Sequence, residues 1–274
     1  MAIKTRFSLF FPVLSFFCGS LYASDALIFS TAPTQTPVKT KELYQPLVDH
    51  LAKVTGREIH LKPARNFLEY TSNMQKGKYD ILFDGPHFVS WRIAQRNHKV
   101  VAKLPGDIRF VVVGRDDANI RDYRSLSGKK VCAFESPNLL SLGFLDLYSS
   151  PGSQPILVRV KSFQDSLDCV KKGKGVAAIM HDEFWERRTA EQKQGLELLY
   201  ETDKPYPHRA FSVSNRVDVK TREIIIKALM SKAGALSGQA VLQHFRSKQF
   251  APASSEEYHG MEALLKPVWG YRIQ

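Results

Sequence analysis

The chain lacks the short motifs that mark the common classes of enzyme, and it has few cysteines. Its 274 residues contain three cysteines and no P-loop, glycine-rich dinucleotide fingerprint, paired CxxC or HExxH sequence. The Gly-x-Ser-x-Gly elbow of serine hydrolases is also missing. His50, His60 and His98 are not spaced like metal ligands. We therefore expect no bound metal and no cofactor.

No apolar run is long enough to span a membrane. The run from Phe7 to Phe17 is about half of the roughly 20 residues that a spanning helix needs. Lys4 and Arg6 precede it, and Ala23 offers a small residue for cleavage, which is typical of a secretory signal peptide. We predict a signal peptide at residues 1–23, cleaved near Ala23, and an exported mature protein. An uncleaved membrane anchor is the alternative.

Acidic residues are outnumbered by basic ones, 27 to 39, which gives a net charge of +12. The basic residues are spread along the chain and do not alternate with aromatic residues as in a nucleic-acid-binding module. We therefore expect no nucleic-acid partner. A positive field suits a protein that binds anionic ligands or meets acidic surfaces, and a generally solvated basic surface is the alternative.

Only Cys132 and Cys169 remain once the signal peptide is removed. Export places both in an oxidising compartment, so we predict a single disulfide between them. The alternative is an exported enzyme in which Cys132 or Cys169 is the nucleophile and His181 or Asp182 is the base. A disulfide would leave such an enzyme without its thiolate, so a count of free thiols separates the two readings.

Short apolar runs alternate with amphipathic stretches along the chain, which predicts an α/β fold. Residues 66–88 also align without a gap with residues 162–184. Both segments read as a helix cap, a short helix, a Lys-Gly-Lys turn, an apolar strand, a polar stop and an aromatic residue. We therefore predict two lobes of similar construction, with chance agreement between two common helix-turn-strand units as the alternative.

Three predicted strands end in polar residues that lead into a helix. They lie at 79–83, 130–134 and 176–180. After the first strand, Pro86 suits the first turn of a helix, with Asp84 or Gly85 as the cap. After the second, Ser136 is the predicted N-cap and Pro137 the first helical residue. The carboxyl ends of strands are where open α/β sheets bind ligands.

The predicted ligand-binding residues gather around these strand ends. We expect an aromatic wall, donors at helix starts, two histidine donors, and carboxylates that cap helices or bind a ligand amine. They are Tyr44, Asp84, Gly85, His87, Ser136, Asn138, Ser141, His181 and Asp182. Each also has a structural alternative: a cap without a ligand role, a histidine outside the site, or a core aromatic residue.

Four segments of the chain resemble the periplasmic substrate-binding proteins of phosphate/phosphonate-type ABC transporters, within the type II periplasmic binding-protein fold. These segments are LYQPLVDHLAKVTGREIHL (43–61), MQKGKYDILFDGPHF (74–88), DYRSLSGKKVCAFESPNLLSLGFL (122–145) and KKGKGVAAIM (171–180). The resemblance covers residues 27–246. It implies two α/β lobes, with lobe one at 25–112 plus 210–274 and lobe two at 113–209. It also implies two crossing segments, at 110–113 and 207–213, that act as a hinge.

The resemblance further implies a non-catalytic, monomeric periplasmic protein. Such a protein captures a small polar or anionic ligand between its lobes and delivers it to an ABC permease at the membrane. A sensory binding protein that presents its closed form to a receptor kinase would have the same sequence, so that alternative stays open.

One departure from the family pattern concerns the ligand. The phosphonate binders carry a Ser-Thr-Ser run at a helix start in lobe two, and this chain has Leu140-Ser141-Leu142 there. Two of the three hydroxyl positions are therefore leucines. The family's histidine in a lobe-two helix has no counterpart around Phe163-Gln164. We expect these changes to weaken phosphonate binding, because each lost charge-assisted hydrogen bond contributes on the order of 1.5 to 3 kcal/mol.

Overall fold

Two five-stranded sheets form the framework of the protein in the computed structural model, which describes residues 25–271. The first sheet has the strand order β2-β1-β3-β12-β4 and the second β10-β6-β9-β7-β8. The first contains β1 (Leu27–Ser30), β2 (Ile59–Leu61), β3 (Ile81–Asp84), β4 (Lys99–Lys103) and β12 (Ala210–Val213). The second contains β6 (Phe110–Arg115), β7 (Lys130–Phe134), β8 (Ile156–Val160), β9 (Ala177–His181) and β10 (Leu196–Glu201).

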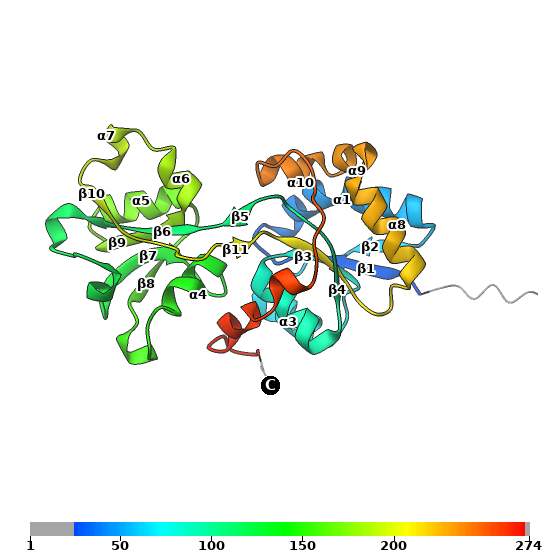
Figure 1. Ribbon diagram of the computed structural model, residues 1–274, viewed down its shortest axis with the longest axis horizontal. Coiled ribbons are helices and arrows are strands. Elements are labelled where there is room, and N and C mark those ends of the chain that lie inside the picture. The colour runs from blue at the N-terminus through cyan, green and yellow to red at the C-terminus, as the bar shows by residue number, and fades with distance from the viewer. Residues whose placement is uncertain (1–24, 272–274) are drawn as a thin grey trace, which may run out of the picture.

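The two sheets are built alike. In the first, β1, β2 and β3 run parallel, and β12 pairs antiparallel with β3 and β4. In the second, β7, β8 and β9 run parallel, and β6 pairs antiparallel with β9 and β10. Each sheet carries its own helices, and the two halves lie side by side along the long axis of the molecule (Figure 1). The predicted α/β class is confirmed. We call the halves the first and second lobes, after their sheets.

Helices cover both sheets. In the first lobe they are α1 (Pro37–Thr55), α2 (Phe67–Gln75), α3 (Pro86–Arg96), α8 (Val219–Met230), α9 (Lys232–Ser237) and α10 (Gln239–His244). In the second they are α4 (Leu139–Leu145), α5 (Phe163–Lys171), α6 (Asp182–Glu186) and α7 (Ala190–Lys193). Short 3-10 turns complete the chain: η1 (Asp116–Ala118), η2 (Tyr123–Leu126), η3 (Pro151–Ser153), η4 (Glu256–Tyr258) and η5 (Met261–Leu265). Within residues 25–271 no helix combines the length and apolar character needed to cross a membrane. The predicted signal peptide lies outside the described residues.

The internal similarity seen in the sequence is confirmed in three dimensions. Helices α2 and α5 have nine residues each, and β3 and β9 follow them at the same spacing. Each helix begins with a side-chain cap, from Asn66 to the amide of Glu69 and from Ser162 to the amide of Asp165. Gly77 and Gly173 follow the helices with positive φ angles of 65° and 68°, which glycine adopts without steric cost. The two lobes therefore contain the same helix-turn-strand unit.

A small two-stranded sheet connects the lobes. It pairs β5 (Asp107–Ile108) with β11 (Tyr206–Pro207), and both strands lie between the two large sheets in Figure 1. The predicted crossing at 110–113 lies slightly too far along the chain, because β6 pairs only with strands of the second sheet. The predicted lobe limit at residue 112 therefore falls inside β6, whereas the limit at 210 coincides with the start of β12. The extents of the lobes as independent units stay a prediction.

A disulfide joins Cys132 on β7 to Cys169 on α5, with the two Cα atoms 6.2 Å apart. Both cysteines are buried in the core beneath the second sheet. The predicted pairing is confirmed, and it fastens α5 to the sheet.

An apolar cluster spans the two lobes. Leu142 and Phe144 of α4 belong to the same buried cluster as Trp91 of α3 and Leu265 of η5. Helix α4 contacts η5, which also packs on α3. The C-terminal part of the chain therefore reaches from the first lobe to the second.

Candidate ligand-binding site

A helix follows each of the strands β3, β7 and β9, as the sequence predicts, and one of the predicted caps is wrong. Gly85 is the residue before α3 and makes no side-chain cap, while Asp84 is the last residue of β3. Asn138, not Ser136, caps α4, since its Oδ1 accepts from the Leu140 amide at 3.0 Å. The prediction of Ser136 as the N-cap was wrong because α4 begins at Leu139, two residues beyond Pro137. Ser136 is exposed.

Asp84 is fully buried and paired with an arginine that the sequence analysis missed. Its two carboxylate oxygens accept from the Arg92 guanidinium of α3 at 2.7 and 2.9 Å, and the Tyr70 hydroxyl donates to it as well. Burial raises the pKa of Asp84, and the Arg92 guanidinium opposes this. Because both oxygens are occupied, the arrangement favours the structural alternative for Asp84: it fixes α3 to β3.

His87 connects the two lobes directly. It lies in the first turn of α3, and its Nε2 is 3.0 Å from the carbonyl oxygen of Pro137 in the second lobe. A carbonyl oxygen only accepts, so Nε2 carries the proton. Burial lowers the pKa of His87 to about 3, and the ring is neutral. Gly85 is needed beside it, since a Cβ there would lie 2.8 Å from the His87 ring.

The second lobe brings four of its predicted residues to the ends of the adjacent parallel strands β7 and β9. His181 Nδ1 lies 2.7 Å from the Asp182 carboxylate, and both side chains are partly exposed. The Ser141 hydroxyl is buried and donates to the Phe134 carbonyl at 2.6 Å. The single hydroxyl left in the Leu-Ser-Leu run is therefore used within the fold, and so is the Asn138 amide oxygen.

Tyr44 lies on α1 and is 4% exposed. Its ring packs 5.9 Å from Phe29 and 6.1 Å from Phe83, measured between centroids. Burial raises the pKa of Tyr44 to about 12, with Arg209 opposing, so its hydroxyl is neutral at physiological pH. Tyr44 therefore packs in the apolar core of the first lobe, next to the strand ends. Its role in ligand binding stays a prediction.

Arg209 is a site residue that the sequence analysis missed. It stands between β11 and β12, and its backbone carbonyl accepts from the Leu104 amide. Its guanidinium carbon lies 4.8 Å from the centre of the Phe245 ring, and it interacts electrostatically with Tyr44 and Asp84. An arginine within Pro-His-Arg-Ala carries no local pattern, so only the fold could place it beside the strand ends.

His208 directly follows the hinge strand β11, and its Nδ1 accepts from the Arg209 amide at 2.8 Å. Burial, with a further contribution from the Arg209 charge, lowers the pKa of His208 to about 3. The end of β9 lies near the hinge because His181 pairs with Phe110, two residues beyond the hinge strand β5. His181 therefore lies beside one hinge strand, β5, and His208 and Arg209 directly follow the other, β11.

The family of the protein follows from a comparison with known sequences. Residues 29–258 match a family described as the periplasmic substrate-binding protein of phosphonate ABC transporters. The chain belongs to this family. The match covers both lobes and the hinge, including every strand end described above.

Individual relatives agree with this assignment. The Phosphate-import protein PhnD of Mycolicibacterium smegmatis is 27% identical over 131 residues, which is 44% of this chain and 40% of the relative. The aligned part therefore spans less than half of that relative's length. PhnD1 from Prochlorococcus marinus, solved in complex with methylphosphonate, has a TM-score of 0.65 at 17% identity, with 90% of this chain and 99% of that chain covered. A phosphonate-transporter binding protein from Pseudomonas aeruginosa has a TM-score of 0.61 at 12% identity, with 86% and 83% covered. At these identities the two structures support the fold.

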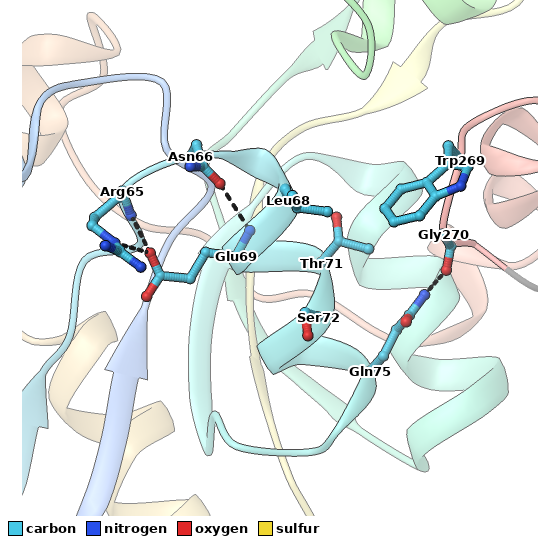
Figure 2. Close-up of a pocket in the computed structure, with 9 residues that line it drawn as sticks. All are labelled: Arg65, Asn66, Leu68, Glu69, Thr71, Ser72, Gln75, Trp269 and Gly270. Atoms are coloured by element: carbon cyan, nitrogen blue, oxygen red, sulfur yellow. Dashed lines mark hydrogen bonds and ion pairs between the residues drawn. The ribbon is translucent and has the colours of Figure 1, made fainter.

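A separate pocket lies on the first lobe, with a volume of about 380 Å³. Figure 2 shows it between α2 and the C-terminal segment at Trp269 and Gly270, with the Arg65–Glu69 ion pair at one end. None of the predicted ligand-binding residues lines it. Across residues 25–271, no group of three or more His, Cys, Asp or Glu side chains is arranged to hold a metal ion.

Proposed function

We propose that this protein is an exported, non-catalytic binding protein that holds a small phosphonate or phosphate between its lobes and delivers it to an ABC permease. The observation that carries the proposal is the family match across residues 29–258, which includes both lobes and the hinge. The names of the relatives point to the same ligand class, phosphate in one case and methylphosphonate in another.

The geometry supports a site between the lobes. The starts of α3 and α4 meet at the His87–Pro137 hydrogen bond, and His181 lies near the hinge residue His208. We propose that the two lobes, one built on each five-stranded sheet, close on the ligand by bending at the β5–β11 pair. A ligand that contacts both lobes would stabilise the closed state by its differential affinity for it.

The disulfide supports a role without catalysis. Cys132 and Cys169 are bonded to each other, so neither offers a thiolate nucleophile. In this proposal the protein is a monomer without a cofactor. Cleavage near Ala23 would release it into the periplasm, the compartment that its family implies.

A thermal-shift series on the mature protein tests the proposal. Methylphosphonate and inorganic phosphate are each compared with ethanolamine and with sodium chloride at the same ionic strength. A ligand at about 100 times its Kd stabilises the folded state by about 2.7 kcal/mol, which corresponds to about 5 to 10 °C for a whole protein of this size. We expect such a shift with at least one of the two phosphorus anions. A shift with ethanolamine alone, or with no compound, would refute the proposed ligand class.

A further inference from the structure

Arg209 occupies a central position in the neighbourhood where the lobes meet. It directly precedes β12, whose first residue Ala210 pairs with Asp84 at the end of β3. Its charge acts on Tyr44, on the buried His87 and on the partly buried His208. The charge of the Arg209 guanidinium therefore acts on side chains of α1, of α3 and of the hinge.

The charge of Arg209 has no counterion within residues 25–271. No hydrogen bond or ion pair reaches its guanidinium from any side chain in that range, and the guanidinium lies over the Phe245 ring. The acid that interacts with it, Asp84, already binds Arg92 through both oxygens. The neighbouring histidines are neutral and supply no negative charge.

Removing an unpaired arginine partly from water costs free energy unless an anion pairs with it. Desolvation by burial lowers the pKa of Arg209, the direction expected for a cation without a partner. Guanidinium groups present a planar fork that matches carboxylate and phosphate oxygens in pairs. The missing partner therefore has the chemistry of an oxyanion.

We propose that Arg209 is the principal anchor for the oxyanion group of the ligand, replacing the hydroxyl run that this chain lacks. The inference rests on the proposed function and deepens it. Leu140 and Leu142 offer no hydroxyl, and the Ser141 hydroxyl is bound to the Phe134 carbonyl. A single arginine at the hinge supplies the charge that the helix start of the second lobe does not.

The position of Arg209 also relates binding to closure. It lies immediately beyond the crossing strand β11, so an anion held there contacts the segment that must bend when the lobes move. His208, its neighbour in sequence, interacts with His181 of the second lobe. A ligand on Arg209 is thus within the region where both lobes meet.

Calorimetric titration of the mature protein with methylphosphonate and with inorganic phosphate tests the inference. We compare the wild type with Arg209→Gln, Arg209→Lys and a matched control, Arg121→Gln, which removes an exposed arginine of the second lobe. We expect Arg209→Gln to weaken binding by about 100-fold and Arg209→Lys by about 10-fold, because lysine keeps the charge and loses the fork. The control should bind within about twofold of the wild type.

Melting of the ligand-free variants provides a second readout. Removing an uncompensated charge should leave the melting midpoint of Arg209→Gln equal to or above that of the wild type. A clearly lower midpoint would assign Arg209 a structural role and overturn the inference. Equal affinity of Arg209→Gln and wild type would overturn it as well, while leaving the proposed function intact. A wild type that binds neither anion would overturn both.

Discussion

Replacing Asp84 with alanine lowers the free energy of unfolding by about 3–5 kcal/mol, the range expected when a buried ion pair loses one partner. Arg92 and Asp84 are 1% and 0% exposed, so the change leaves a guanidinium buried without its carboxylate. Arg92 would keep only weaker partners, including the Ser212 hydroxyl at 3.0 Å. Equilibrium unfolding in urea, followed by circular dichroism, measures the loss.

Two further variants make this expectation specific. Asp117→Ala breaks an exposed pair with Arg115 and should cost less than about 1 kcal/mol. The double variant Asp84→Leu/Arg92→Met removes both charges and should recover much of the stability lost by Asp84→Ala, because apolar replacements of a buried pair are often close to neutral. If Asp84→Ala unfolds at the same urea concentration as Asp117→Ala, the buried pair does not hold α3 to β3.

Removing the disulfide has the second large effect. The Cys132–Cys169 bond closes a loop with a sequence separation of 37 residues, and a loop of that length corresponds to about 3–4 kcal/mol of stabilisation through the unfolded chain. We expect the Cys132→Ala/Cys169→Ala variant to unfold at a lower guanidinium concentration than the wild type. Its free energy of unfolding should be smaller by that amount. Wild-type protein unfolded in the presence of a reductant should give the same curve.

Two results would contradict the expected role of the disulfide. Wild-type protein whose unfolding curve is unchanged by reductant would mean that the two cysteines are not bonded in solution. Two titratable thiols in denatured, unreduced protein would point the same way, and they would reopen the cysteine-enzyme alternative.

Much of the fold could be predicted from local pattern. The helix-turn-strand unit repeats with the same cap position, glycine turn and apolar strand, because each of these features depends on residues within a few positions of one another. The disulfide followed from having two cysteines in an exported chain. The first crossing segment lies a few residues before the predicted one, because apolar residues at 110–113 suit an interior strand as well as a connection between lobes.

The candidate site was harder to predict, for a physical reason. Asp84, Asn138 and Ser141 lie at the strand and helix ends where the sequence put them, yet their polar atoms serve the fold. Whether a polar group is free for a ligand depends on which neighbours the folded backbone turns toward it, even when those neighbours are near in sequence. Arg92 reaches Asp84 from within α3, eight residues further along the chain, and Arg209 comes from the segment between β11 and β12. Neither position has a local signature, so only the folded structure reveals them.

A crystal structure of the mature protein with methylphosphonate tests most directly whether the ligand binds between the lobes. The phosphonate group should lie between the end of β3 and the end of β9, in contact with residues of both lobes. Phosphonate density confined to one lobe, for example in the pocket beside Trp269, would contradict the account.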